Sequence, residues 1–233
     1  MIQAVILAGG LGTRMRPFTD TIPKPLLPVF GRPFLEYQIE LLQTNGITGF
    51  LLLVSYLGHL IEEHFGSTYR GAQIHYSHES SPLGTGGALK NAAALLDDDF
   101  LVLNGDTLLD IDYRAFAAAF RASGVEAMVA AYRNTAANVP SNLAIDENGL
   151  VLEYQKQRPA GEYVDAGVLA LRKSALSLVP EDRKCSLEEE TFPKLIQRGQ
   201  LLGWATDQPF YDMGTPAGMQ MLEAHISAAK RVR

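Results

Sequence analysis

Apolar runs of strand length alternate with helical patterns through the first hundred residues of the chain. The strand-like runs are residues 3–8, 49–55, 72–78 and 100–106, and the helical patterns are residues 33–46, 57–66 and 85–96. Strand and helix alternating at this rhythm predict an α/β fold in which a parallel sheet is covered by helices on both faces.

The pattern changes after about residue 140. A Glu-Asn-Gly turn inside residues 143–157 predicts a hairpin, and residues 163–172 predict a further strand. Helix starts follow at Ser186 and at Thr215, because each precedes a helical pattern and carries an N-cap signature. We therefore expect one α/β core with a smaller β-containing lobe.

Charge and cysteine content exclude several classes of protein. The net charge is −6 and no basic face is visible, so we expect no nucleic-acid partner. Cys185 is the only cysteine, so an intrachain disulfide is impossible, which fits a reducing, cytoplasmic location. No apolar run approaches the ~20 residues that span a bilayer, so we expect no membrane partner. Homo-oligomerisation stays open.

A glycine-rich loop follows the first strand and carries basic residues. Gly9, Gly10 and Gly12 allow a backbone to approach a phosphate closely, and Arg14 and Lys24 add positive charge. The loop lacks the Gly-Lys-Ser/Thr of a Walker A motif and is not a G-x-G-x-x-G motif. Because ligands bind at the carboxyl ends of parallel strands, the loop predicts a phosphate site there.

Two aspartates follow strand-like runs elsewhere in the chain. Asp106 ends the run 100–106, and Asp212 follows another such run. Carboxylates at this edge of a sheet suit a hard metal ion beside phosphate. The pair therefore predicts one Mg²⁺ site.

Several stretches together resemble the sugar-phosphate nucleotidylyltransferases, from Val5 to about Leu222. They are LAGGLGTRMRPFTDTIPKPLLPV (7–29), PLGTGGAL (82–89), LNGDTL (103–108), Lys156, DAGV (165–168) and YDMGTP (211–216). The resemblance implies a Rossmann-like, mostly parallel sheet flanked by helices, with a smaller sugar-binding lobe. It implies one domain over residues 1–233, with a nucleotide-binding half (about 1–135) and a sugar-phosphate-binding half (about 136–233). The implied reaction joins a nucleoside triphosphate to a sugar 1-phosphate and releases pyrophosphate.

The resemblance also implies a role for individual residues. For the nucleotide these are Leu7, Ala8, Gly9, Gly10, Gly12, Thr13, Arg14, Glu79, Pro82, Gly84, Gly86 and Gly87. For the sugar phosphate they are Asn104, Gly105, Glu153, Lys156, Asp165 and Gly167. Catalysis is implied for Arg14, Lys24, Asp106 and Lys156, and Mg²⁺ binding for Asp106 and Asp212.

The choice of substrates depends on two carboxylates. Glu79 can accept hydrogen bonds from a guanine edge, which favours GTP, and it can equally face water. Asp165 replaces the Asn that is common in the family, and a carboxylate favours a neutral, donor-rich sugar. Within the family the chain most resembles guanylyltransferases for D-glycero-D-manno-heptose 1-phosphate. Uridylyl or thymidylyl transfer to another sugar, and a non-catalytic nucleotide-sugar sensor, remain alternatives.

Overall fold

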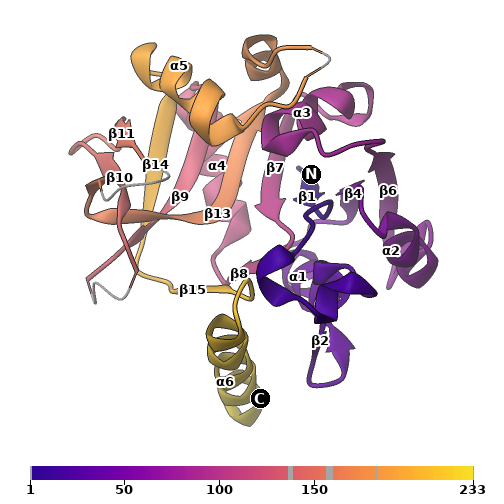
Figure 1. The fold of residues 1–233 in the computed structure, drawn as a ribbon. Coiled ribbons are helices and arrows are strands. Elements are labelled where there is room, and N and C mark those ends of the chain that lie inside the picture. The colour runs from indigo at the N-terminus through magenta and orange to yellow at the C-terminus, as the bar shows by residue number, and fades with distance from the viewer. Residues whose placement is uncertain (1, 136–138, 156–159, 182, 233) are drawn as a thin grey trace.

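A computed structural model describes residues 2–135, 139–155, 160–181 and 183–232 (Figure 1). The helices are α1 (Phe34–Thr44), α2 (Gly58–Phe65), α3 (Gly84–Asn91), α4 (Tyr113–Ser123), α5 (Phe192–Gln197) and α6 (Pro216–Val232). Among these described helices, none combines the length and the hydropathy that a bilayer-spanning segment needs.

A large mixed sheet forms the centre of the molecule. Its strands are β1 (Gln3–Leu7), β4 (Gly49–Val54), β5 (Thr68–Tyr69), β6 (Ala72–His78), β7 (Asp99–Asn104), β9 (Ala127–Arg133), β10 (Asn142–Ile145), β11 (Val151–Tyr154), β12 (Ala160–Gly161), β13 (Tyr163–Arg172) and β14 (Leu201–Thr206). In space they run β5-β6-β4-β1-β7-β13-β9-β14, and β10, β11 and β12 extend from the start of β13. Strands β1, β4, β6 and β7 are parallel, so the predicted mostly parallel sheet is confirmed.

Strand β13 differs from the expected arrangement. Residues 163–172 form a strand as predicted, but this strand lies in the main sheet and not in a separate lobe. It runs antiparallel to β7 on one side and to β9 on the other. Its second half is buried on both faces, as a central strand must be. The sheet therefore continues without a break from the first half of the chain into the second.

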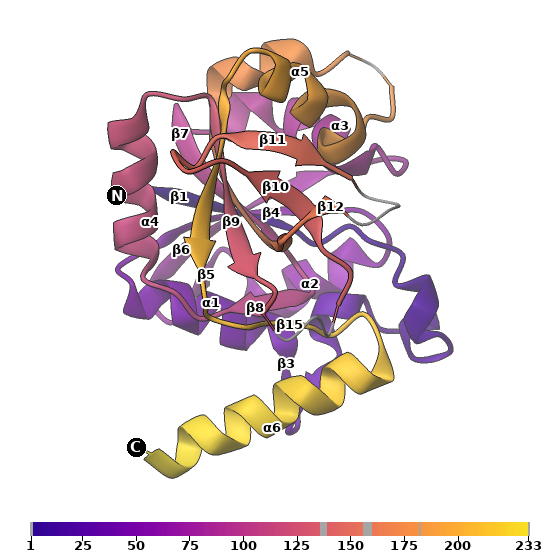
Figure 2. The same cartoon turned by 90° about the vertical axis from the view of Figure 1, so that its left-hand side faces the viewer.

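Helices cover both faces of the sheet (Figures 1 and 2). One core contains Ile39 of α1, Ile61 of α2 and Phe116 of α4, packed on residues such as Ile6 of β1. The other core contains Leu89 of α3 and Leu195 of α5, packed on the opposite face. This layering fits the alternation of strands and helices in the sequence.

Two small antiparallel ladders lie outside the large sheet. One pairs β8 (Thr107–Leu109) with β15 (Phe210–Asp212), and the other pairs β2 (Pro28–Val29) with β3 (Arg32–Pro33). Helix α6 follows β15 and lies apart from the main sheet, at the bottom of Figure 1. It begins as predicted, because the Thr215 hydroxyl accepts a hydrogen bond of 3.1 Å from the Gly218 amide.

Candidate active site

A cavity of about 560 Å³ opens at the carboxyl ends of β1, β6 and β7. We call one side the glycine wall, which consists of Leu7, Gly9, Gly10, Glu79, Pro82 and Gly84. We call the other side the tyrosine wall, which consists of Asn142, Tyr154, Asp165 and Glu188. Between the walls lie Lys24, Asn104, Gly105 and Asp106.

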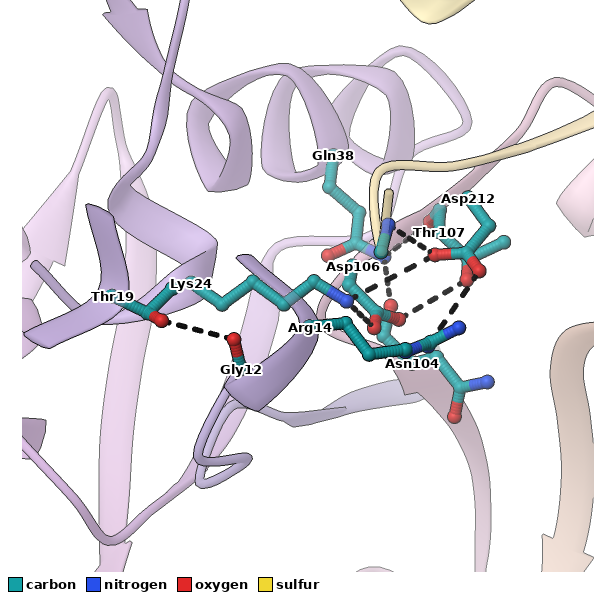
Figure 3. Close-up of polar contacts among 10 residues, drawn as sticks. Gly12, Arg14, Thr19, Lys24, Gln38, Asn104, Asp106, Thr107 and Asp212 are labelled. Carbon is teal, nitrogen blue, oxygen red and sulfur yellow. Dashed lines mark hydrogen bonds and ion pairs between the residues drawn. The ribbon is translucent and has the colours of Figure 1, made fainter. Parts of the chain in front are cut away.

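Four charged side chains meet beside this cavity (Figure 3): Lys24 and Asp106 line it, and Arg14 and Asp212 contact this pair without being lining residues. The Lys24 ammonium contacts Asp106 Oδ2 and lies 3.9 Å from Asp212 Oδ1. Arg14 Nη2 lies 4.0 Å from Asp212 Oδ2. The Lys24 side chain is only 9% exposed, so it depends on these carboxylates, whereas Arg14 is 66% exposed and can turn toward a ligand. The structure thus brings together the four residues that the sequence predicted to act jointly.

The two aspartates converge because β8 and β15 pair. Thr107, which follows Asp106, stands opposite Asp212 in this ladder. The Met213 amide also donates to the Asp106 carbonyl at 2.9 Å. Residues about a hundred positions apart in the chain therefore share one short ladder.

Gly214 allows Asp212 to take its position. Its amide donates to Asp212 Oδ1 at 2.6 Å. A Cβ at this position would lie 2.7 Å from Asp212 Oδ1 and 2.8 Å from Arg14 Nη2. Any larger residue would therefore displace the charged side chains.

A third, small core lies beneath the charged cluster. It contains Met15, Leu27, Leu108 and Met213, together with Phe34 and, from α6, Leu222 and Ile226. Each of the first four of these core residues follows one of the charged residues in the chain, at a distance of at most three positions. This core therefore anchors all four chain segments at once.

Buried Gln38 on α1 supports the floor of the cavity. Its side-chain amide donates to the carbonyls of Asn104 and Thr107, at 2.8 and 2.9 Å. These two bonds hold the turn that carries Asp106. Sequence reasoning missed Gln38, although a glutamine on the apolar face of a helix was a visible signal.

The glycine wall is built largely from glycine backbone. Gly9 and Gly10 line the cavity, and Gly12 has a φ of +61° at the start of the turn that carries Arg14. The Thr19 hydroxyl donates to the Gly12 carbonyl at 2.9 Å and fixes the turn. A Cβ on Gly9 would lie 3.2 Å from Glu79 Oε1, which places this carboxylate beside the loop.

Glu79 has one oxygen committed to the protein. Its Oε2 accepts a hydrogen bond of 2.7 Å from the Leu83 amide, which fixes the carboxylate at the cavity. Burial raises the pKa of Glu79 above its ordinary value, and the bond from Leu83 opposes this shift only in part.

The tyrosine wall is centred on Asp165. Its Oδ2 accepts a hydrogen bond of 3.0 Å from the Tyr154 hydroxyl, and its Oδ1 accepts one of 2.9 Å from the Gly167 amide. The Asp165 amide donates to Asn142 Oδ1 at 2.9 Å. Gly167 has a φ of +74°, and a Cβ there would lie 2.9 Å from Asn104 Nδ2. Asp165, Asn104 and Gly167 are therefore close together, as predicted.

Other predicted residues lie elsewhere. The Gly86 and Gly87 amides donate to the Cys185 carbonyl, so they pack on the 183–187 segment and do not face the cavity. Glu153 is exposed and accepts a hydrogen bond from Gln155, whereas its neighbour Tyr154 lines the cavity.

Three more of the predicted residues do not line the cavity. Ala8 is buried beneath the loop, and Gly12 and Thr13 lead into the turn before Arg14. Lys156 lies outside the described residues.

Sequence reasoning also missed Asn142, Tyr154, Thr85, Lys184 and Glu188, all of which line the cavity. Thr85 lies within the PLGTGGAL motif but was given no role of its own, and the other four lie outside the stretches quoted above. Their common signal was polar character next to a predicted turn or cap, which is frequent in any chain.

Comparisons with known proteins find relatives along nearly the whole chain. The chain matches the family model described as Nucleotidyl transferase over residues 3–229. It is 34% identical to a D-glycero-alpha-D-manno-heptose 1-phosphate guanylyltransferase of Campylobacter jejuni, over 92% of this chain and 96% of that protein. It is 33% identical to a mannose-1-phosphate guanylyltransferase of Mycobacterium tuberculosis, of which it spans 62%. The crystal structure of HddC from Yersinia pseudotuberculosis complexed with GMP-PN matches with a TM-score of 0.82 and 29% identity, over 97% of this chain and 100% of that one.

Proposed function

Because the chain belongs to the nucleotidyl transferase family, we propose that it transfers a guanylyl group from GTP to D-glycero-D-manno-heptose 1-phosphate, releasing pyrophosphate. One observation carries this proposal above the others. Arg14, Lys24, Asp106 and Asp212 meet at the edge of a single cavity whose two walls differ in chemistry.

The reaction asks the protein for positioning and charge. An oxygen of the sugar phosphate attacks the α-phosphorus, the bond to the β-phosphate breaks, and pyrophosphate leaves with that electron pair. Both reactants are anions, so cations must offset their repulsion. Arg14 and Lys24 supply that charge where the glycine loop brings the triphosphate. Lys156, which lies outside the described residues, is proposed to hold the sugar phosphate.

The family generally uses a divalent metal ion, and we propose Mg²⁺ here. Asp106 and Asp212 offer the hard oxygen donors that this ion prefers, both are partly exposed, and Asp106 lines the cavity. Among the described residues, no three His, Cys, Asp or Glu side chains gather to hold a metal on their own. That fits a site completed by substrate phosphates. The ion would neutralise phosphate charge.

Glu79 supports the choice of GTP. The guanine edge carries an N1–H and a 2-amino group as donors, and an ionised carboxylate is a pure acceptor. Glu79 Oε1 lies beside Gly9 on the glycine wall, while Oε2 is held by Leu83. Uracil and thymine offer a single imide N–H, so this side chain favours guanine.

The tyrosine wall supports a neutral sugar. Asp165 is held by Tyr154 and Gly167, and a carboxylate at that point repels an acidic acceptor. A heptose has many hydroxyl donors and no carboxyl group. We therefore assign residues 1–135 chiefly to the nucleotide and residues 136–233 chiefly to the sugar phosphate.

A pyrophosphate-release assay tests the whole proposal. Four nucleoside triphosphates are combined with heptose, mannose, glucose and N-acetylmuramic acid 1-phosphates, each with Mg²⁺ and with EDTA. We expect the highest kcat/KM for GTP with the heptose compound, and no turnover in EDTA. Preference for UTP or dTTP rejects the base assignment, and preference for the muramic acid compound rejects the sugar assignment. If none of the substrate pairs releases pyrophosphate, the proposed activity is rejected.

A further inference from the structure

Asn142 is the first residue of β10, and backbone bonds fix this end of the strand. The Asn142 carbonyl accepts a hydrogen bond of 2.8 Å from the Gln155 amide, and the Ser141 carbonyl accepts one of 2.9 Å from the Ala160 amide. In the sheet, Asn142 stands opposite Ala160 of β12. A side chain that starts from backbone held in this way has a well-defined position on the tyrosine wall.

The side-chain amide of Asn142 is oriented by one further bond. Its Oδ1 accepts a hydrogen bond of 2.9 Å from the Asp165 amide. Only the oxygen of a side-chain amide can accept from a backbone N–H, so this contact decides which end of the amide is the oxygen and which is the NH₂ group. Oδ1 is therefore committed to the protein, and Nδ2 forms the other end of a fixed amide.

The NH₂ group of Asn142 keeps both of its donors. Within the part of the chain that the structure describes, Nδ2 donates no hydrogen bond. The buried side-chain atoms that lack a partner in this part belong to Gln38, Asn134, Arg172 and Thr191. Nδ2 is not one of them, so it is accessible to solvent, and Asn142 is a half-buried residue that lines the cavity. These donors are therefore free to bind a ligand.

The place of Asn142 indicates which part of the substrates meets these donors. The glycine wall, proposed to hold the nucleotide, lies on the other side of the cavity, and Lys24 lies between the walls. A cation binds a phosphate more strongly than a neutral amide does. The partner that suits Nδ2 is therefore a neutral oxygen acceptor on the acceptor side of the cavity, and a sugar hydroxyl provides one.

We infer that Asn142 is a specificity-determining residue whose Nδ2 donates a hydrogen bond to a hydroxyl oxygen of the acceptor sugar. The inference rests on the proposed transfer to a sugar 1-phosphate. It adds a donor to the tyrosine wall, where an ionised carboxylate can only accept. An amide donor selects for an acceptor atom at one position of the sugar.

Steady-state kinetics of the full chain with GTP and modified acceptors test the inference. In analogues of D-glycero-D-manno-heptose 1-phosphate, each hydroxyl in turn is replaced by hydrogen or by fluorine, which accepts a weak hydrogen bond and donates none. If the wild type prefers mannose 1-phosphate in the pyrophosphate-release assay, the analogues are those of mannose.

Two variants change the donor, and a third is the control. Asn142→Asp keeps an oxygen for the Asp165 amide and exchanges the NH₂ donor for an acceptor. Asn142→Ala removes the whole amide. Asn148→Asp is the matched control, since Asn148 is exposed, follows β10 and is not among the described residues that line the cavity.

At one position of the sugar, the wild type should prefer the hydroxyl compound, then the fluoro compound, and then the deoxy compound. We expect KM for the deoxy compound to exceed that for the hydroxyl compound about fivefold. In Asn142→Asp the fluoro compound should become the poorest of the three, because its fluorine faces an acceptor. Asn142→Ala should raise KM for the hydroxyl compound about fivefold and lose the preference for fluorine over hydrogen. KM for GTP should change by less than about twofold throughout, and Asn148→Asp should match the wild type.

The outcomes separate the inference from the proposed function. The inference is overturned if the wild type prefers fluorine over hydrogen at no position, or if either variant of Asn142 keeps that preference. Equal rises in KM for GTP and for the sugar phosphate also overturn it, because they indicate a general disturbance of the cavity. The comparison within the wild type needs no variant to fold. If the wild type transfers to no sugar 1-phosphate, the proposed function itself is rejected.

Discussion

The two walls of the cavity are held in place by different kinds of bond. The glycine wall is formed by loops at the ends of β1 and β6, and backbone contacts such as the bond from the Ala8 amide to the Leu53 carbonyl (2.9 Å) fix it. The tyrosine wall is fixed by side chains from distant segments, such as Tyr154 with Asp165 and Thr85 with Glu188. Motifs therefore reveal most of the first wall, whereas in the second wall they reveal only Asp165 and tertiary structure reveals its partners.

This difference predicts different kinetic consequences. Changes in the charged cluster beside the glycine wall should act on turnover, because its charges matter most as the transition state forms. Changes in the tyrosine wall should act on KM for the acceptor, because its contacts are made to parts of the sugar that do not react.

The largest effect should come from the aspartates. Asp106→Asn removes a charge that holds Lys24 and that is proposed to bind metal, and it keeps the shape of the side chain. We expect kcat to fall by ~10³-fold or more, with little change in the far-UV circular dichroism spectrum. Asp212→Asn should behave likewise. Near-normal kcat in either variant contradicts the metal assignment.

Arg14 should give the next largest effect. Its side chain is 66% exposed and 4.0 Å from Asp212, so Arg14→Ala should leave Tm nearly unchanged. We expect kcat/KM to fall ~10²-fold, since charge beside the phosphates is lost. Arg16→Ala is the matched control, because Arg16 is equally exposed and pairs with Asp20 at 3.2 Å. Equal losses in the two variants would mean that the position of Arg14 has no special role.

Tyr154 should give a smaller and more selective effect. Tyr154→Phe removes the hydroxyl that orients Asp165 and keeps the ring against Phe192, at a centroid distance of 5.1 Å. We expect KM for the sugar phosphate to rise about five- to tenfold while kcat and KM for GTP stay within about twofold. Tyr163→Phe on β13 serves as the control. A fall in kcat alone would place Tyr154 in the chemical step. It would contradict the expectation that the tyrosine wall acts on KM for the acceptor.

The smallest effect should come from Glu79 and should depend on pH. Because burial raises its pKa in the folded state, ionised Glu79 costs stability, and that cost appears as pH rises from its ordinary pKa of 4.5 through the raised value. Glu79→Gln should therefore raise Tm slightly near neutral pH, with the gain vanishing below about pH 4.5.

The same variant should lower the preference for GTP over UTP by about threefold. Thermal scans across pH and competition assays check the two expectations separately. A Tm gain without a loss of GTP preference would assign Glu79 to the fold alone.

The sequence predicted the parts of the molecule that depend on local pattern. The strands β1, β4, β6 and β7 and the starts of α1 and α6 follow from periodicity and capping. Asp106 and Asp212 follow from strand ends, and Lys24 follows from the charge of the glycine-rich loop. The antiparallel direction of β13 did not follow, since an apolar run has the same pattern in either direction. Its place between β7 and β9 depends on long-range pairing.

Some predicted site residues lie away from the cavity for a similar reason. The resemblance implied a nucleotide-binding role for Gly86 and Gly87, but the partner of both amides in the structure is the Cys185 carbonyl. The resemblance implied a sugar-phosphate role for Glu153, whereas its neighbour Tyr154 is the one that lines the cavity. The pairing of β11 with β10 decides which side chains of β11 face the cavity. This pairing cannot be read from the local residue pattern of β11.

The third core should lose its packing at a lower temperature than the central sheet. It is much smaller than the cores on either face of the sheet, and it includes residues of α6 at the end of the chain. Small peripheral units open locally at a lower free energy than the whole fold. Opening of α6 would free Met213 and so release Asp212 from Lys24 while β1, β4 and β7 stay paired. Heat inactivation should therefore begin below the temperature at which the sheet unfolds, and it should be reversible on cooling over that interval.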